Sequence, residues 1–336
     1  MQKKVILLLS VVTLFFLCIV KTCSLLGIHN TRELTTDKHI EVVEEGREVL
    51  NNFNYNSFQG TDTGVSFFDG KYIYFNTSNY LLKYDIYDGT ETPVTAGMPV
   101  KCMSDGGDFI YGVTTMEDST GNLKDYLVKV PKDGGSTEIF YKTECNHITS
   151  VAYDGLYAYY TDESHCIYRM GEELEEWSYS DKSADFPYII GIFGNMLYIT
   201  DGTKISYINV LDGAWQTAYN GLCSVMQKPI ISDGLIYMMS DFNQNEIICI
   251  DIETGNTEVI INKSFINAVA KAEKIDSFSV SGDILFMNCD GKLYRKYLEE
   301  DGTPRFYRNI ESVQSSSFDG NAYYVENDKM VVLNIN

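Results

Sequence analysis

The sequence contains little proline, tryptophan or histidine. It has 6 Pro, 2 Trp and 4 His in 336 residues. Beyond its first two dozen residues it also lacks any long apolar stripe with helical spacing, which excludes a bundle of amphipathic helices. Aromatic residues, by contrast, make up 13% of the chain and include 25 Tyr and 17 Phe. That content excludes a disordered chain and favours strands, whose pleated surface accommodates aromatic side chains.

Positive charge is also scarce. The chain has 26 Lys and Arg against 47 Asp and Glu, which gives a net charge of −21. Three of its lysines lie in or beside the N-terminal segment, so the remainder is still more acidic. Phosphate backbones would repel such a body, so nucleic-acid binding is excluded. The charge serves either solubility or the attraction of a basic partner or a cation.

Catalytic and cofactor motifs are missing. The sequence has no Gly-x-Ser-x-Gly, no phosphate-binding glycine loop, no EF-hand and no His-x-x-x-His. The four histidines, which we interpret as solvated or locally bonded, are His29, His39, His147 and His165. We therefore predict no catalytic residue, no metal and no cofactor. Paired carboxylates could hydrolyse glycosides, but 47 acidic residues give too many chance pairs to select one.

The N-terminus has the pattern of an export signal. Lys3 and Lys4 precede an uncharged apolar run over residues 5–20, which Lys21 ends. This length suits a signal peptide and is marginal for a membrane span. The lysines before the run should stay inside the cell, so the body is exported. Three outcomes are open: cleavage, a retained anchor, or lipidation at Cys23, where Lys21 departs from the small uncharged residues that a lipobox requires.

Six cysteines lie beyond this segment. An even number in an exported chain permits disulfides. Several of them, however, lie inside apolar runs and suit buried free thiols in strands. Both interpretations are open. The six are Cys102, Cys145, Cys166, Cys223, Cys249 and Cys289.

An internal repeat organises the body. Its unit is a small or acidic residue, a glycine turn and a short aromatic-aliphatic run, as in Asp69-Gly70-Lys71-Tyr72-Ile73-Tyr74. A period near 40 residues with such hairpin turns is typical of propeller blades. The strands that follow the turns are apolar at almost every position, as expected where both faces are covered. The seven copies begin at Asp69, Asp105, Asp154, Phe193, Asp233, Ser281 and Asp319.

The repeat predicts an all-β fold, a seven-bladed β-propeller. The last copy supplies only three strands, so we expect residues 49–55 to add the fourth by pairing with residues 330–335. The expected organisation is a signal peptide or membrane anchor at 1–23, a charged tether at 24–47 and the propeller at 48–336. The second and fifth copies are longer, with insertions near residues 117–124 and 265–274.

Some copies resemble YWTD-type propellers of the low-density-lipoprotein-receptor class. Tyr159-Tyr160-Thr161-Asp162 precedes Ile167, Tyr198-Ile199-Thr200-Asp201 precedes Ile205, and Tyr237-Met238-Met239-Ser240-Asp241 precedes Ile247. No copy has the tryptophan of that motif. The chain is more similar to a bacterial family of exported propellers of unknown function, and the resemblance covers roughly residues 50–336. It implies a fold and no particular activity.

The candidate site residues come from these same copies. Asp162, Asp201 and Asp241 recur at one place in their blades, either to fix a turn by hydrogen bonding or to face a ligand as a ring of carboxylates. We predict a monomeric binding module without catalysis, exported to the outer face of the cytoplasmic membrane or the cell surface of a bacterium. Its partner would be an envelope protein or a small ligand, and only its N-terminal segment would touch the membrane. The alternative is a carbohydrate-active hydrolase that uses carboxylates in the central pocket.

Overall fold

The computed structural model of this chain is almost entirely β-structure. The chain divides into two units between Glu33 and Leu34, and every described residue belongs to the second unit. The structure describes residues 64–77, 80–95, 97–142, 147–162, 166–171, 174–178, 187–223, 229–240, 245–300, 302–309, 316–318, 321–326 and 329–333. The predicted signal segment and tether lie outside the described residues.

Seven antiparallel sheets follow one another along the chain, and within each sheet neighbouring strands are consecutive in sequence. Blades 1 and 2 contain β1 (Gly64–Phe68), β2 (Tyr72–Asn76), β3 (Leu81–Asp85), β4 (Glu91–Pro93), β5 (Lys101–Gly106), β6 (Phe109–Glu117), β7 (Leu123–Pro131) and β8 (Glu138–Lys142). Blades 3 and 4 contain β9 (Ile148–Tyr153), β10 (Ala158–Asp162), β11 (Cys166–Met170), β12 (Leu174–Ser178), β13 (Tyr188–Phe193), β14 (Met196–Thr200), β15 (Lys204–Asn209) and β16 (Trp215–Asn220).

The remaining three sheets complete the series. Blades 5 and 6 contain β17 (Ile230–Ser232), β18 (Leu235–Met239), β19 (Ile247–Asp251), β20 (Thr257–Ile261), β21 (Ser277–Ser281), β22 (Ile284–Cys289), β23 (Lys292–Tyr297) and β24 (Arg305–Asn309). The seventh sheet contains β25 (Ser316–Phe318), β26 (Asn321–Glu326) and β27 (Lys329–Leu333). A short helical insertion, α2 (Lys263–Phe265) and the π-helical η1 (Ile266–Ala270), lies between blades 5 and 6.

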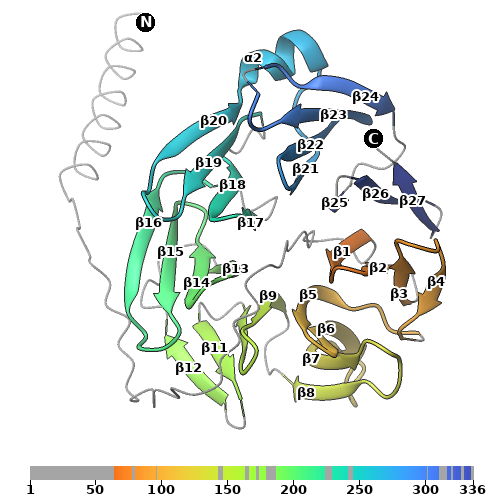
Figure 1. Cartoon of the computed structure of the whole chain (residues 1–336). Helices are drawn as coiled ribbons and strands as arrows, with labels where there is room; N and C mark the ends of the chain where they lie inside the picture. The colour runs from red at the N-terminus through yellow and green to blue at the C-terminus, as the bar shows by residue number, and fades with distance from the viewer. Residues whose placement is uncertain are drawn as a thin grey trace, which may run out of the picture. The chain divides into compact units, whose positions relative to one another are not determined.

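The sheets are arranged around a common axis (Figure 1). The first strand of each sheet contacts the first strand of the next, from β1 through β5, β9, β13, β17 and β21 to β25. Two contacts return to the start of the series. Strand β26 contacts β1, and the backbone N–H of Met330 in β27 donates to the Glu91 carboxylate of blade 1 at 2.8 Å. The sheets therefore form a closed circuit, as in a β-propeller.

The sequence predicted seven complete blades, and that count is wrong for the described residues. Six sheets have four strands, and the seventh has three. The reason is that the last repeat copy carries only three strands. The segment 49–55, which we expected to add the fourth, lies outside the described residues.

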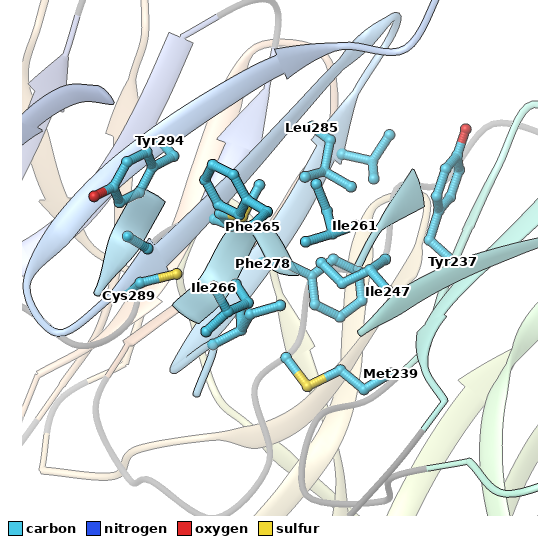
Figure 2. Packing of buried hydrophobic residues seen from close by; sticks show 14 of the residues in the cluster. Tyr237, Met239, Ile247, Ile261, Phe265, Ile266, Phe278, Leu285, Cys289 and Tyr294 are labelled. Atoms are coloured by element: carbon cyan, nitrogen blue, oxygen red, sulfur yellow. The ribbon is translucent and has the colours of Figure 1, made fainter. Parts of the chain in front are cut away.

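Hydrophobic clusters lie between neighbouring sheets. The largest joins blade 5 to blade 6 and contains Met239, Ile247, Phe278 and Leu285 (Figure 2). Six further clusters each join one adjacent pair of sheets, including the seventh sheet with blade 1, where Tyr323 meets residues of β2. Strand β10 is buried along its whole length. This confirms the expectation that strands lose their polar–apolar alternation where both faces are covered.

The repeated Asp-Gly step has a structural cause. In blade 3, Asp154 accepts two backbone N–H groups of its own turn, and its other carboxylate oxygen accepts the Tyr159 hydroxyl at 2.7 Å. In blade 1, Asp69 receives the hydroxyl of Tyr74 in the same way, at 2.9 Å. Gly70 and Gly155 adopt φ values of 95° and 94°, which other residues rarely reach. One aspartate thus fixes the turn and satisfies a buried tyrosine.

Both insertions belong to ordered structure. The insertion near residues 117–124 lengthens a hairpin, because β6 and β7 are nine residues long and pair along their whole length. The insertion in the fifth copy forms α2 and η1. Phe265, Ile266 and Ala270 of these helices are buried in the cluster between blades 5 and 6. The extra residues therefore fill the space between two blades.

The described cysteines are free thiols. Cys223, Cys249 and Cys289 are buried, and Cys102 and Cys166 are partly exposed. Burial raises the pKa of both Cys223 and Cys289 to about 12, so these thiols stay protonated and unreactive. The interpretation as buried thiols in strands is confirmed for Cys249 in β19 and Cys289 in β22, whereas Cys223 is buried just after β16. Cys145 lies outside the described residues.

The pairing of Asp154 with Tyr159 predicts a measurable loss of stability. Tyr159→Phe leaves one oxygen of a buried carboxylate without its donor, which should cost about 1–3 kcal/mol of unfolding free energy. Tyr157→Phe, which removes a hydroxyl from the same hairpin that makes no hydrogen bond to the described residues, should cost much less. Urea denaturation of both variants measures the difference, and equal losses would contradict the assigned role of Asp154.

Candidate functional site

Two of the three predicted aspartates lie where the second strands of their blades end. Asp162 closes β10 and Asp201 follows β14, and each is only 2% exposed. Asp201 accepts the backbone N–H and the hydroxyl of Thr203 at 2.9 and 2.7 Å, and the N–H of Lys204 at 3.1 Å. Its carboxylate therefore fixes the turn into β15. Asp241 lies outside the described residues, so a ring of ligand-facing carboxylates stays a prediction.

A second polar cluster lies at the end of blades 2 and 3 where their inner strands begin, here called the linker end. Its centre is Asp125 of β7, which is 1% exposed. Asp125 accepts the Thr115 hydroxyl at 2.6 Å and the backbone N–H of Ile148 at 2.9 Å. His147 Nδ1 lies 3.2 Å from one carboxylate oxygen, and Lys101 Nζ lies 3.4 Å from the other. Four donors from three strands and a linker thus converge on one buried carboxylate.

These donors fix the charge of Asp125. Burial by itself would raise the pKa of this carboxyl, because it disfavours the charged form. The hydrogen bonds from His147, Thr115 and Ile148, together with the charge of Lys101, outweigh burial and lower the pKa to about 2. Asp125 is therefore a permanent anion. It binds the imidazole of His147 and the ammonium of Lys101, whose side chains are 51% and 24% exposed.

One predicted residue lies at the same end of the blades as this cluster. Asp162 is the cross-strand partner of Ile148, whose N–H binds Asp125 and which directly follows His147. None of the described contacts joins its carboxylate to Asp125 or His147, so its shared position is that of the backbone. From the sequence we interpreted His147 as solvated or locally bonded, and we did not select Asp125. The only feature of the sequence that could have indicated Asp125 was its charge inside the apolar run of β7. Charged residues are common at edge and surface positions of strands, so this feature did not single it out.

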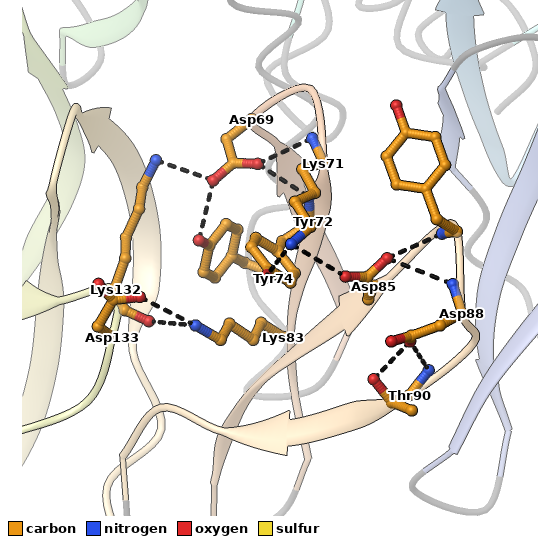
Figure 3. A network of polar contacts seen from close by, with 11 residues as sticks. Asp69, Lys71, Tyr72, Tyr74, Lys83, Asp85, Asp88, Thr90, Lys132 and Asp133 are labelled. Carbon is orange, nitrogen blue, oxygen red and sulfur yellow. Dashed lines mark hydrogen bonds and ion pairs between the residues drawn. The ribbon is translucent and has the colours of Figure 1, made fainter.

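A third cluster lies at the opposite end, called the turn end because the Asp-Gly turns lie there. Lys132 Nζ lies 3.1 Å from an oxygen of Asp69 (Figure 3). The same atom lies 2.8 Å from an oxygen of Asp105. Lys83 of β3 in turn donates to the carbonyl of Lys132 at 2.9 Å. One ammonium of blade 2 therefore joins the inner-strand ends of blades 1 and 2.

The two carboxylates of this cluster differ in their pKa. Burial raises the pKa of Asp105 more than Lys132 lowers it. In Asp69 burial acts in the same direction, but hydrogen bonds from the turn N–H groups and the charge of Lys132 prevail, so its pKa is lowered. Such a split pair is a feature of glycosidase sites. Here, however, the Lys132 ammonium lies between the carboxylates and binds both, so the pair acts as a clamp between blades.

The described residues contain neither a metal site nor a membrane-spanning helix. They hold no group of three or more His, Cys, Asp or Glu that could bind a metal ion. The helical segments among them are too short to cross a bilayer.

The circuit of sheets and the clusters between them define a β-propeller. No family model and no curated protein matches the sequence. Among solved structures, the chain resembles a puromycin-hydrolyzing peptidase of Mycobacterium tuberculosis, with a TM-score of 0.52 and 12% identity over 82% of this chain and 51% of the peptidase. It also resembles the extracellular domain of the hybrid two-component system BT4673 from B. thetaiotaomicron, with a TM-score of 0.56 and 13% identity over 85% of this chain and 40% of that one.

These likenesses show the fold alone. The chain spans about half the length of the first structure and two fifths of the second. In all, 573 solved chains match, so the fold is shared too widely to indicate one activity. Function has to be argued from the polar clusters.

The lowered pKa of Asp125 predicts a pH-dependent loss in a variant. A folded-state pKa near 2, below the unfolded value near 4, means that the carboxylate stabilises the fold above about pH 4 and loses this effect as the pH falls toward 2. Asp125→Asn should therefore lower the unfolding free energy by about 2–3 kcal/mol at neutral pH and by progressively less below about pH 4. Denaturant titrations across this range measure it.

Asp108→Asn is the matched control, because Asp108 is an exposed aspartate of the same blade. It should change stability little at any pH. A loss in Asp125→Asn that stays constant from neutral to acid pH would contradict the assigned electrostatic role.

Proposed function

We propose that this chain is an extracytoplasmic binding module, held at the membrane by its N-terminal segment, whose partner binds the linker end of blades 2 and 3. The expected organisation supports export: a signal peptide or anchor at 1–23, a charged tether at 24–47 and a propeller from residue 48. Its relation to YWTD-type propellers and to exported bacterial propellers is part of the proposal. It is supported by the Tyr-x-Thr-Asp segments that end at Asp162 and Asp201.

The observation that carries the proposed site is the saturation of Asp125. Its oxygens already accept four donors, so the carboxylate is an anchor and not itself a ligand-binding group. The groups left to meet a partner are the half-exposed ring of His147 and the remaining N–H bonds of Lys101. Both are held by a buried anion, and side chains fixed in this way bind with little loss of conformational freedom.

The geometry favours binding over hydrolysis. Among the described residues no hydroxyl or thiol is hydrogen-bonded to His147, so the pair lacks the nucleophile that an imidazole–carboxylate dyad would activate. The two carboxylates of the turn end, Asp69 and Asp105, are bridged by Lys132. The hydrolase alternative would require that lysine to move away.

The test is capture of envelope components by the full-length chain and its variants. A partner bound by the wild type should be lost in His147→Ala and in Lys101→Ala and kept in Lys129→Ala, a lysine of the same blade outside the cluster. Equal capture by all four proteins would place the binding surface elsewhere. Turnover of a glycan panel that disappears in Asp69→Asn would establish the hydrolase instead.

We also propose that residues 49–55 close the ring as the fourth strand of the seventh sheet. This proposal is supported by the three-stranded seventh sheet, in which β27 is the outermost described strand. Glu91 accepts the Met330 N–H, so that donor points away from β26. Because backbone groups alternate along a strand, Val332 is the next residue of β27 whose N–H and C=O point away from β26. Val332 is 36% exposed and would pair with the added strand.

Two adjacent proline variants test the closing strand. Successive N–H groups of a strand point to opposite sides, so an edge strand tolerates proline at one position and loses a ladder bond at the next. Either Asn51→Pro or Asn52→Pro should lower the unfolding free energy by about 1–3 kcal/mol while the other has little effect. If both prolines are tolerated equally well, the closing strand is refuted.

A further inference from the structure

The β6–β7 hairpin of blade 2 continues past the start of its own inner strand. The first residue of β5, Lys101, pairs with Val113, and β6 runs on for four residues to Glu117. Four residues of an antiparallel strand span about 14 Å. Asp118 fixes the turn at the tip, because its carboxylate accepts the backbone N–H of Asn122 at 3.0 Å. The hairpin therefore projects at the linker end as an ordered arm, here called the blade 2 arm (residues 114–125).

One face of the blade 2 arm continues the face that packs on blade 3. Leu127 is buried in the cluster between blades 2 and 3, and residues two apart along a strand share a face. Asp125 lies two residues from Leu127, and Leu123 lies two residues further out. Leu123 is 64% exposed. An apolar side chain thus lies about 7 Å along the strand from the buried carboxylate that binds Lys101 and His147.

The two side chains held by Asp125 offer different hydrogen-bonding groups. An ammonium has three N–H donors, and Lys101 Nζ makes one described contact, to Asp125 at 3.4 Å. A neutral imidazole has one donor and one acceptor. Because Nδ1 of His147 faces the Asp125 carboxylate at 3.2 Å, this nitrogen carries the proton in the neutral ring and Nε2 is the acceptor. The pair therefore presents a charged donor for an anion beside an acceptor for an N–H group.

The surrounding charge limits what kind of anion can bind. Glu117 is exposed and is the cross-strand partner of Leu123, so its side chain lies on the same face of the arm. Its carboxylate repels a negative group near the tip and leaves Lys101 as the favoured position for one. The net charge of −21 disfavours polyanions in the same way. The face thus suits a ligand with a single carboxylate next to an apolar group.

We propose that the linker end binds the C-terminal residue of a polypeptide that ends in an apolar side chain. The α-carboxylate of that residue binds the Lys101 ammonium, its backbone N–H donates to Nε2 of His147, and its side chain covers Leu123. The inference rests on the proposed function, because it names the chemistry of the partner at that same site.

A chain end matches this arrangement better than an internal acidic residue does. In a C-terminal residue the carboxylate, the N–H and the side chain all radiate from one Cα. They can therefore meet a charged donor, an acceptor and an apolar side chain that are gathered around one buried carboxylate. An internal Asp or Glu carries its carboxylate on the side chain, so a second residue would have to supply the apolar group.

Binding of short peptides to the full-length chain tests the inference. The probe is an acetylated peptide of glycines that ends in leucine with a free carboxylate, measured by isothermal titration calorimetry. Its C-terminal amide should bind about 10-fold more weakly or worse, because the charge-assisted hydrogen bond to Lys101 is lost. N-methylation of the last amide should weaken binding about 5-fold, because His147 loses its donor. An amidated peptide with an aspartate before the leucine should bind no better than the plain amide.

Variants assign these losses to side chains. Lys101→Met should abolish the preference for the free carboxylate, whereas Lys101→Arg, which keeps the charge, should retain it. His147→Ala should abolish the penalty of N-methylation. Leu123→Ser should reduce the difference between peptides that end in leucine and in glycine, and it leaves the donors of Asp125 untouched, so it tests the site even if Lys101→Met is unstable. Ile139→Ser is the matched control, because Ile139 of β8 is an apolar residue of the same blade that is 52% exposed.

Failure of this inference and failure of the proposed function are distinguishable. Equal binding of the free and amidated peptides, or no binding of either, overturns C-terminal recognition. The proposed function still stands in that case if envelope capture depends on Lys101 and His147. A preference for the free carboxylate that persists in Lys101→Met overturns the inference, because the site then lies elsewhere. Equal or tighter binding of the aspartate peptide overturns it as well, because an acidic side chain is then the ligand. If the preference disappears in Lys101→Met while envelope capture is the same in all variants, the inference holds and the envelope partner binds elsewhere.

Discussion

Every sheet of this protein is apolar on both faces, and a sheet of that kind cannot leave water without a neighbour on each side. One sheet packed on another would still expose two apolar faces. A series of sheets around an axis removes the problem only when the last meets the first. Seven hydrophobic clusters lie at seven successive junctions, including the one between the seventh sheet and blade 1. Burial of this kind is the main source of folding free energy, so the ring is the condition for the stability of each blade.

Closure in turn determines where polar groups can be tolerated. At several blade junctions a side chain accepts the N–H of a residue in the inner strand, or in the linker, of the next blade. The side chain of Asn76 accepts the N–H of Val100 at 3.0 Å. In the same way, Asp125 accepts the N–H of Ile148 at 2.9 Å, and Ser150 accepts the N–H of Ile189 at 2.8 Å. A buried N–H without a partner is costly. These side chains therefore let the chain pass between blades at low cost, and Asp125 differs from the others by also holding two exposed donors.

The parts of the fold that the sequence could predict are those set by local chemistry. The Asp-Gly step recurs because each hairpin needs positive φ and a buried tyrosine hydroxyl needs an acceptor. The propeller fold and the order of its strands could therefore be inferred from residues such as Asp154 and Tyr159, but the number of complete blades could not. The polar clusters could not be inferred from the sequence. Asp125 and His147 are 22 residues apart, and Lys132 reaches Asp69 over 63 residues. Nothing local distinguishes these side chains from other surface charges, because they meet only once the ring brings neighbouring blades together.

The polar clusters at the two ends of the blades differ in what each can still do. Lys132 binds two carboxylates of the turn end, which gives that end a structural role. Asp125 already accepts four donors, and two of them, His147 and Lys101, still reach solvent. For this reason the proposed binding surface lies at the linker end.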